Sequence, residues 1–415
     1  MEAPFRVAFV FVAPVLPLDV RMMVEALEQA HSLQFLVTSW CFTERELGTL
    51  RPFRNLSRFA ERRISPVSSA KLVRSVCSEW LWRAFHAAGG NAFHAMDSAF
   101  ASIDRQAARR INEVSTGVMG REDCCLNSFR CARERGLPRL YVLPTAHFRT
   151  VEHLLRHEQE QFPEAFWPTI LDQDFAEARI ARKKSELEMA TEILCPSSFV
   201  HYSLLAAGVS AEKISTIPLG ADDRLAKATR LTEKTKLSSY REPVFLYAGN
   251  VSARKGVHRL LNAWRKLKAY RTHRLRLIGS MNLPESFLAD YRGTFEHVPR
   301  LLRRELMLEY SRAQCFVFNA LADGFGHVFA EAMLAGTPVL ASRNCGAPDL
   351  ITSGWEGLLF DYGNDEQLCA ALDWSLSHPR ELEEMGIHAQ HRAFQWGWRE
   401  FQKAFIGWAL PQAYE

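Results

Sequence analysis

The chain has 415 residues, which exceeds what one hydrophobic core normally serves, so we expect two domains. With 47% hydrophobic and 24% charged residues, it has the composition of an ordinary globular protein. The formal net charge of +4 argues against a nucleic-acid-binding role for the chain as a whole. No nucleic acid is therefore expected among its partners.

The nine cysteines are scattered along the chain and show neither a C-x-x-C pair nor zinc spacing. Such a set favours reduced thiols and a cytoplasmic location. The apolar segment Phe5–Ala13 is too short to span a bilayer and lacks a cleavage-site pattern, so we expect a buried parallel strand there.

Short apolar runs alternate with longer helical patterns along the whole chain, which indicates parallel sheets covered by helices. In the first half the expected strands are Val7–Ala13, Phe35–Ser39, Leu140–Leu143, Ile193–Cys195 and Ile214–Ile217. In the second half they are Val244–Ala248, Leu275–Ile278, Phe295–Val298, Cys315–Asn319 and Pro338–Ser342. The α/β pattern predicts two doubly wound, Rossmann-like domains that face each other across a ligand-binding cleft.

Residues 51–86 hold eight cations against two acids, and aromatic residues interleave with them. Basic stretches of this kind bind anionic lipid surfaces, so peripheral contact with the inner face of the membrane is one hypothesis for this segment. The alternative is a solvated helical face with Trp80 and Trp82 turned into the core.

His147 directly follows the expected strand Leu140–Leu143 and should therefore face the cleft. It is a candidate catalytic residue, although an isolated histidine is more often a structural hydrogen bonder. Glu122 and Asp123 lie in the loop before an expected helix at Cys124–Arg135. They are candidates for binding hydroxyl groups of a substrate, and surface solvation is the alternative.

A glycine turn follows the strand Val244–Ala248 and precedes the helical pattern Val257–Leu267. It brings Arg254 and Lys255 to the mouth of the cleft, where a guanidinium and an ammonium group can clamp a pyrophosphate. A solvated basic turn is the alternative interpretation.

The most informative segment runs from residue 319 to residue 351. Asp323 lies in a glycine-bracketed loop, and Glu331 follows eight positions later in the nearly apolar helix His327–Ala335. A carboxylate in such a buried helix needs hydrogen-bond donors, and the paired hydroxyls of a ribose are suitable donors. A salt bridge from Glu331 to a neighbouring arginine is the alternative. The free amides at the helix start, near Gly326, suit a phosphate.

Asp323-x7-Glu331, with Gly-Phe-Gly after the first acid and Glu-Ala-Met-x-Ala-Gly-Thr-Pro around the second, resembles the signature of glycosyltransferase family four. The resemblance implies the GT-B fold and retaining sugar transfer. The catalytic residues that it implies are His147, Lys255 and Asp323. The donor-binding residues that it implies are Gly249, Asn250, Arg254, Lys255, Val298, Gly324, Phe325, Gly326 and Glu331.

Two positions depart from the family pattern. Asn250 stands where the family often has an arginine on the donor phosphates, which favours weaker phosphate binding. The loop Ala13–Asp19 lacks the paired glycines that many members carry, which predicts a different acceptor geometry.

Retention in this family is usually attributed to front-face attack, a route that needs neither a protein nucleophile nor a metal. The resemblance therefore implies no required cofactor and a nucleotide-diphosphate sugar as donor, with UDP or GDP favoured. The Asp172-Gln-Asp174 segment and the pair His153 and His157 are expected to be surface residues rather than metal ligands.

An acceptor-side domain is expected at residues 1–218, completed by a crossing helix within 396–415, and a nucleotide-sugar-binding domain at 219–395. Packing of the helix Arg399–Leu410 on the second domain alone is the alternative. The expected function is transfer of a sugar to a hydroxyl of a glycan or lipid-linked acceptor, in bacterial polysaccharide, glycolipid or other glycoconjugate synthesis. The alternative function is a catalytically weak partner subunit that binds nucleotide or glycan. An epimerase of the same fold and a NAD-binding protein fit the motifs less well.

Overall fold

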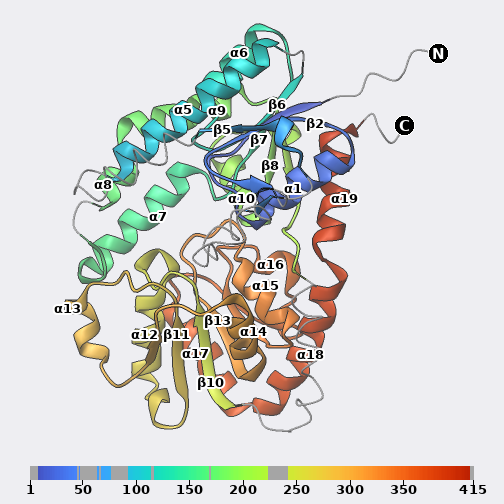
Figure 1. Ribbon diagram of the computed structural model, residues 1–415. Helices are drawn as coiled ribbons and strands as arrows, with labels where there is room; N and C mark the ends of the chain where they lie inside the picture. Colours follow the sequence, from blue (N-terminus) through green and yellow to red (C-terminus); the bar gives the residue numbers. More distant parts are fainter. Residues whose placement is uncertain are drawn as a thin grey trace.

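The structure of the chain is a computed structural model. It describes residues 8–43, 46, 63–64, 67–75, 92–113, 116–167, 170–222 and 242–411. Two parallel sheets, each flanked by helices, lie one above the other in Figure 1. This arrangement confirms the expected pair of Rossmann-like domains. The boundary between them, near residues 219–242, falls largely outside the described residues and stays a prediction.

The first sheet has seven parallel strands in the order β5-β2-β1-β6-β7-β8-β9. The order reverses at β1 and β6, so a crevice opens beyond the carboxyl ends of these two strands. A two-stranded sheet, β3-β4, accompanies it. The strands are β1 (Phe9–Val12), β2 (Leu33–Thr38), β3 (Phe42–Thr43), β4 (Arg63–Ile64), β5 (Leu72–Arg74), β6 (Gly117–Arg121), β7 (Arg139–Val142), β8 (Glu192–Cys195) and β9 (Ile214–Thr216).

The second sheet has six parallel strands in the order β12-β11-β10-β13-β14-β15. Its order reverses at β10 and β13, whose following loops carry Lys255 and Asp323. The strands are β10 (Glu242–Ala248), β11 (Arg274–Ile278), β12 (Glu296–Val298), β13 (Ala313–Phe318), β14 (Val339–Ser342) and β15 (Gly357–Phe360).

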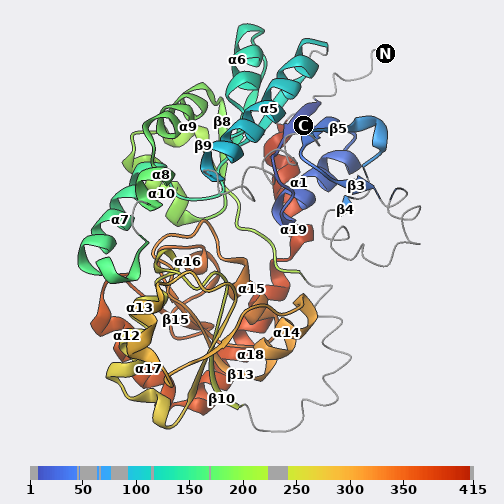
Figure 2. The same cartoon turned by 60° about the vertical axis from the view of Figure 1, so that its left-hand side comes forward.

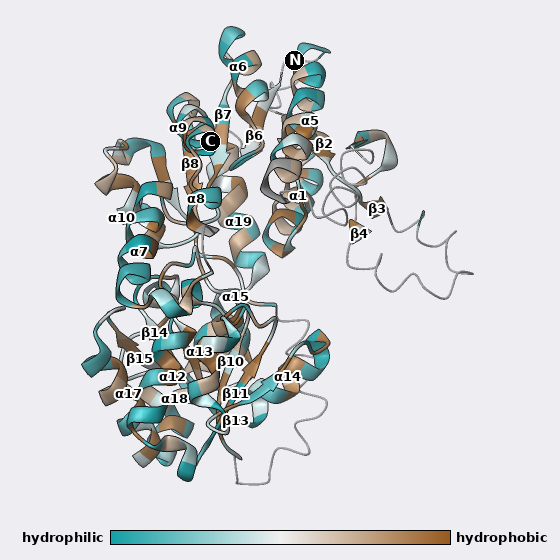
Figure 3. Ribbon diagram, turned by 90° about the vertical axis from the view of Figure 1, so that its left-hand side faces the viewer, coloured by the Kyte–Doolittle hydropathy of each residue, from teal (hydrophilic) through white to brown (hydrophobic). Residues whose placement is uncertain are grey.

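Helices cover both faces of each sheet, and Figure 3 shows the apolar strands enclosed between helices whose outer faces are hydrophilic. In the first half the α-helices are α1 (Leu18–Gln29), α5 (Ala92–Glu113), α6 (Leu126–Glu134), α7 (Phe148–Gln161), α8 (Ile170–Asp174), α9 (Glu177–Met189) and α10 (Ser198–Ala206). In the second half they are α12 (Val257–Lys266), α13 (Glu285–Leu288), α14 (Arg303–Arg312), α15 (His327–Leu334), α16 (Ala347–Leu350), α17 (Asp365–Ser377), α18 (Pro379–Gln395) and α19 (Trp398–Ala409). Within the described ranges, none of the helices is both long and apolar enough to cross a membrane.

Strand β1 shows why a parallel strand reads as a continuous apolar run. Phe9 and Phe11 pack in the cluster that contains α1 residues, whereas Val10 and Val12 pack in the cluster that contains α5 residues. All four side chains are at most 1% exposed. Because both faces of the strand are buried, every position is apolar and the sequence predicts the strand well.

The expected strands are all present, with each end shifted by at most two residues, but β3, β4, β5, β6 and β15 were not expected. Strand β6 reads Gly-Val-Met-Gly-Arg, so glycines and a cation interrupt its apolar run. The glycines are required by close packing, because a Cβ on Gly120 would lie 2.3 Å from the Cβ of Cys125. Sequence reasoning therefore missed the strand that forms one side of the crevice.

Helix α19 returns from the second domain and packs against α1, as Figures 1 and 2 show. The side-chain amide of Gln402 donates to the Met22 carbonyl at 3.0 Å. Just before the helix, the Trp396 indole donates to the Pro218 carbonyl at 2.9 Å. The expected crossing helix is confirmed, and packing on the second domain alone is wrong.

Most of the segment 51–86, including Trp80 and Trp82, lies outside the described residues. The parts that are described form β4, a short 3-10 turn at Ser69–Lys71 and β5. The membrane hypothesis and its alternative both stay open.

A buried carboxylate joins the two domains. Glu158, on α7 of the first domain, is 2% exposed and accepts hydrogen bonds from His258, Arg259 and Tyr362 of the second domain. The Arg259 Nε–Oε1 and Nη2–Oε2 distances are 2.6 and 2.9 Å, which makes this ion pair bidentate. Burial opposes ionisation of Glu158, but the hydrogen bonds from His258 and Arg259 outweigh it and lower its pKa to about 2.

Replacing Glu158 by Gln should lower the free energy of unfolding by about 3 kcal/mol, because the buried Arg259 would lose its bidentate partner and keep only the ion pair with the exposed Asp365. The pKa of about 2 in the folded chain lies below the ordinary value of 4.5, so this stabilisation is full above pH 4.5 and is lost as the pH falls toward 2. The melting temperatures of the two proteins, followed from neutral to acid pH, should differ by a constant amount above about pH 5 and converge below it.

Glu160→Gln on the same helix is the matched control, because Glu160 is exposed. Its melting temperature should follow that of the unsubstituted chain. Equal losses in the two variants would contradict the role given to Glu158.

Candidate functional site

A cavity of about 300 Å³ lies between the two domains, where the carboxyl ends of the two sheets approach each other. The second domain contributes the ends of β10 and β13 and the start of α15. The first domain contributes the start of α1 and the ends of β6, β7 and β8. The strands thus place their following loops around one space, as expected for facing doubly wound sheets.

The loop after β10 carries the expected cationic turn. Residues Ala253–Lys255 form a 3-10 turn that leads into α12 through Gly256, whose φ is 66°. The loop after β13 holds this turn in place, because the Asn319 side chain donates to the Gly256 carbonyl at 3.0 Å. Gly249 and Lys255 both line the cavity.

Lys255 and Asp323 meet at the cavity wall, where the ammonium group and the carboxylate form an ion pair. The second carboxylate oxygen of Asp323 accepts a hydrogen bond from the Phe325 amide at 3.2 Å. Burial opposes ionisation of Asp323, but Lys255 outweighs it and lowers the pKa of this carboxyl. The structure therefore brings together two of the three predicted catalytic residues, on the two loops that flank the reversal point of the second sheet.

Gly324 lies where the two domains come closest. A Cβ at this position would fall 1.8 Å from the Pro144 carbonyl oxygen, so only glycine fits. The Gly324 carbonyl accepts a hydrogen bond from the Ser197 hydroxyl at 2.6 Å. Ser197 also caps α10 by accepting a hydrogen bond from the Val200 amide. Phe325 and Gly326 follow and line the cavity.

Arg254 points toward the first domain, and its Nη2 lies 3.4 Å from the Thr145 hydroxyl. Unlike Lys255, it is not among the residues that line the cavity. Asn250 is exposed, and its side-chain oxygen accepts a hydrogen bond from the Asn282 amide group. The Asn282 carbonyl in turn accepts from the Trp167 indole of the first domain at 3.1 Å. Asn250 is thus hydrogen-bonded to Asn282, the residue that contacts the first domain.

Glu331 pairs with an arginine, as the alternative interpretation of the sequence held. Its Oε1 lies 2.9 Å from Arg303 Nη2, and Arg303 Nη1 lies 3.2 Å from the Asp222 carboxylate. Glu331 is not among the cavity-lining residues, although His327 and Val328, one turn earlier on α15, are. Arg303 is 42% exposed, so the ion pair is open to solvent on one side. The ribose-binding role of Glu331 stays a prediction.

Val298 is the last residue of β12 and does not line the cavity. Its carbonyl accepts a hydrogen bond from the Gly279 amide at 2.9 Å, so this oxygen already has a partner. Recognition of a nucleobase by the backbone near Val298 also stays a prediction.

His147 directly precedes α7 and is 6% exposed. Its backbone amide donates to the Ser203 hydroxyl at 2.9 Å, whereas its Nδ1 is buried and has no hydrogen-bond partner among the described residues. Burial, reinforced by Arg149 and Lys183, lowers the pKa of the imidazole to about 4, so the ring is neutral at neutral pH. It does not line the cavity, and its catalytic role stays a prediction.

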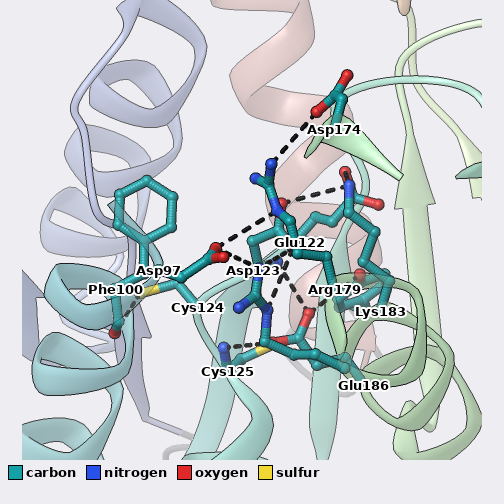
Figure 4. Close-up of polar contacts among 12 residues, drawn as sticks. Asp97, Phe100, Glu122, Asp123, Cys124, Cys125, Asp174, Arg179, Lys183 and Glu186 are labelled. Atoms are coloured by element: carbon teal, nitrogen blue, oxygen red, sulfur yellow. Dashed lines mark hydrogen bonds and ion pairs between the residues drawn. The ribbon is translucent and has the colours of Figure 1, made fainter. Parts of the chain in front are cut away.

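Glu122 and Asp123 belong to a charged cluster between the end of β6 and α9, shown in Figure 4. Lys183 Nζ lies 3.3 Å from a carboxylate oxygen of each. Arg182 Nη2 lies 2.8 Å from Asp123 Oδ1, and Glu186 accepts the Asp123 amide at 2.8 Å. Glu122 is 8% exposed, so surface solvation does not describe it. These side chains fix the loop after β6, and neither lines the cavity.

Sequence reasoning missed two charged residues that do line the cavity, Asp19 and Arg121. Asp19 lies in the first turn of α1, and Arg121 is the last residue of β6. The signal for Asp19 was its place just after the first strand. No signal was available for Arg121 without knowledge of β6.

The nominal metal motifs behave as expected of surface residues. Asp172 has a 70% exposed side chain and pairs with Arg156. His153 and His157 stack on one face of α7. Throughout the part of the chain that the structure describes, no group of three or more His, Cys, Asp or Glu side chains could hold a metal ion.

The chain is similar in sequence and fold to known glycosyltransferases. Residues 230–392 match the family described as "Glycosyl transferases group 1". The chain is 28% identical over 227 residues to the MMP alpha-(1->4)-mannosyltransferase of Mycolicibacterium hassiacum, which covers 52% of each chain. It is also 28% identical to the GDP-mannose-dependent alpha-(1-6)-phosphatidylinositol monomannoside mannosyltransferase of Mycolicibacterium smegmatis, over 47% of this chain and 55% of that protein. The chain thus spans about half the length of these curated relatives.

Solved structures cover nearly the whole chain. A sucrose-phosphate synthase from Thermosynechococcus elongatus superposes with a TM-score of 0.64 at 18% identity, over 99% of both chains. HepE from Anabaena, solved in complex with UDP, superposes with a TM-score of 0.60 at 13% identity, over 98% of this chain and 99% of that one. At such identities the likeness establishes the fold alone. The chain has the GT-B fold, and residues 230–392, in its second half, are similar to the glycosyl transferases group 1 family.

Proposed function

We propose that the chain is a glycosyltransferase that moves a sugar from a nucleotide-diphosphate sugar to an acceptor hydroxyl, with retention of configuration. The observation that carries the proposal is the Lys255–Asp323 ion pair at the wall of the interdomain cavity. The proposal assigns the Lys255 cation to the diphosphate and the Asp323 carboxylate to the sugar, and both residues lie on loops where ligands of doubly wound sheets bind.

The start of α15 supports binding of the donor diphosphate at this end of the cavity. Gly326 precedes the helix with a φ of 96°, and Gly326, His327 and Val328 all line the cavity. The first amides of a helix have no partner within the helix, and its dipole favours an anion there. With Lys255 alongside, these groups can stabilise the negative charge that develops on the departing diphosphate.

In this scheme the acceptor hydroxyl attacks the face of the sugar from which the diphosphate leaves. The bond from the sugar carbon to the phosphate oxygen breaks while the new glycosidic bond forms. The hydroxyl proton passes to the departing phosphate oxygen. The chain contributes positioning and electrostatic stabilisation rather than a nucleophile.

The names of similar proteins support a nucleoside-diphosphate donor. One relative is described as GDP-mannose-dependent, and HepE has been solved with UDP-glucose as well as with UDP. We propose UDP or GDP as the nucleotide, and a glycan or lipid-linked acceptor in bacterial polysaccharide, glycolipid or other glycoconjugate synthesis. Action in the cytoplasm, with contact to the inner membrane face through residues 51–86, is part of the same proposal.

A catalytically weak binding subunit is the second candidate, and Asn250 favours it. Asparagine is uncharged, so position 250 offers no cation for the diphosphate. Its side chain is hydrogen-bonded to Asn282. Turnover separates the two candidates. A transferase hydrolyses its donor slowly without an acceptor, whereas a binding subunit is only stabilised by nucleotide.

Lys255→Ala should reduce donor hydrolysis about 100-fold or more, because it removes the positive charge nearest the expected diphosphate. Release of UDP or GDP from the corresponding glucose and mannose donors is the measurement. Lys266→Ala, an exposed lysine at the end of α12, is the control and should keep full activity. Hydrolysis that survives in Lys255→Ala would remove the ion pair from the mechanism.

Glu331→Gln tests the two interpretations of this carboxylate. If Glu331 binds the ribose, the variant should bind UDP or GDP about tenfold more weakly, because a charge-assisted hydrogen bond is lost. Its affinity for the 2′,3′-dideoxy nucleotide should then equal that of the unsubstituted chain. Isothermal titration supplies the four affinities.

Arg303→Ala is the matched control, since it removes the ion pair and keeps the carboxylate. It should bind the nucleotide at least as tightly as the unsubstituted chain. If Glu331→Gln and Arg303→Ala lower the melting temperature equally and neither changes nucleotide affinity, Glu331 is a structural residue only.

A further inference from the structure

The first-domain wall of the cavity carries one ion pair, at the reversal point of the first sheet. Asp19 follows β1 in the first turn of α1, and Arg121 ends β6, the neighbour of β1. Arg121 Nη1 lies 3.2 Å from Asp19 Oδ2, and the two side chains are 15% and 8% exposed. Because ligands of doubly wound sheets bind at such reversal points, the pair occupies the position from which a substrate on this domain would be held.

The pair has hydrogen-bonding capacity that the protein does not use. The Nη1–Oδ2 contact is the one hydrogen bond that either side chain makes with the described residues. A guanidinium carries five N–H donors and a carboxylate has lone pairs on both oxygens. Both residues line the cavity, so the remaining donors and the second carboxylate oxygen are available to whatever enters it.

The next residue along the chain provides a contrast. Glu122 belongs to the charged cluster of Figure 4, where Lys183 Nζ lies 3.3 Å from its carboxylate. In that cluster, Glu186 accepts from the amides of Asp123 and Cys125 and from the Tyr141 hydroxyl. Burial raises the pKa of Glu186 to about 8, and even so three donors satisfy its oxygens. The Asp19 carboxylate has one donor among the described residues, Arg121.

The charge balance of the cavity limits what the pair can bind. Asp19 and Arg121 neutralise each other, and so do Lys255 and Asp323 across the cavity. An anionic group beside Arg121 would also face the Asp19 carboxylate, which already occupies the positive end of the α1 dipole, whereas the first turn of α15 beside Lys255 holds no acidic residue. The surrounding wall is apolar and includes Met23, Leu219 and Phe401. Such a wall suits the C–H face of a saturated ring.

We propose that Asp19 and Arg121 bind neighbouring hydroxyls of an uncharged polyol acceptor, a sugar or a cyclitol ring. The carboxylate accepts from one hydroxyl and the guanidinium donates to the next, while the apolar wall packs against the ring. The inference rests on the proposed transferase function and names the class of its acceptor. Asp19 and Arg121 would then be acceptor-binding residues, separate from the groups that hold the donor.

The test uses the full chain with whichever UDP-, GDP- or ADP-sugar it hydrolyses. The uncharged acceptor probes are methyl α-glucoside, methyl α-mannoside and myo-inositol, and the charged probes are glucose 6-phosphate and mannose 6-phosphate. The variants are Asp19→Asn, Arg121→Met and Arg121→Lys. Glu28→Gln is the control, because Glu28 lies on the same helix and forms an ion pair with Lys71 outside the cavity.

Transfer is expected to at least one uncharged probe and to be preferred over transfer to the phosphorylated sugars. Asp19→Asn and Arg121→Met should raise the KM for that acceptor about 10- to 100-fold, the effect of losing a hydrogen bond to a charged group. Hydrolysis of the donor by water should stay within about twofold of the unsubstituted chain, because the donor groups are untouched. Arg121→Lys keeps the charge opposite Asp19, so it should fold normally and still raise the acceptor KM.

The outcomes separate the two proposals. Absence of donor hydrolysis in the unsubstituted chain would count against the transferase function itself. Donor hydrolysis with a preference for the phosphorylated sugars, with no transfer to any uncharged probe, or with an unchanged acceptor KM in Arg121→Lys would overturn the acceptor inference alone.

Discussion

The geometry of the cleft depends on one buried carboxylate. Glu158 leaves the first domain on α7 and is enclosed by three donors of the second domain, so a charge that would be costly to bury is fully compensated only when the domains meet. Two further contacts join the domains. The Ser197 hydroxyl donates to the Gly324 carbonyl, and Gly324 packs closely against Pro144. Together these contacts set the distance between the two walls of the cavity.

With that distance fixed, the chemistry of the site follows from the strand order. Each sheet reverses once, and at each reversal two neighbouring loops diverge and leave their backbone and side chains accessible. In the second domain these loops supply Lys255 and Asp323, and in the first domain they supply Asp19 and Arg121. The two ion pairs line one cavity of limited volume. A donor and an acceptor bound there would therefore be close enough to react.

Much of this was predictable from residues, and the misses have physical causes. Strands buried on both faces, such as β1 and β13, are apolar throughout and were predicted. Strand β6 was missed because close packing requires glycine at position 120, and with it Arg121 was missed as a site residue. Glu158 lies in a polar stretch that resembles a solvated helix face. Its partners are about 100 residues or more away in the sequence, so no neighbouring residue indicates that it is buried. Glu331 was recognised as unusual, but sequence alone could not separate a ribose ligand from a partner of Arg303.

The crossing helix has a consequence for synthesis of the chain. Helix α1 presents Met22 and Met23 to a core that α19 completes with Phe401 and Phe405. A ribosome delivers α1 long before α19, with the entire second domain made in between. The first domain therefore stays unfinished, with an apolar helix face uncovered, until α19 has been made. Its maturation is a late event, and protection of that face by a chaperone would matter more here than for a protein whose domains close one after the other.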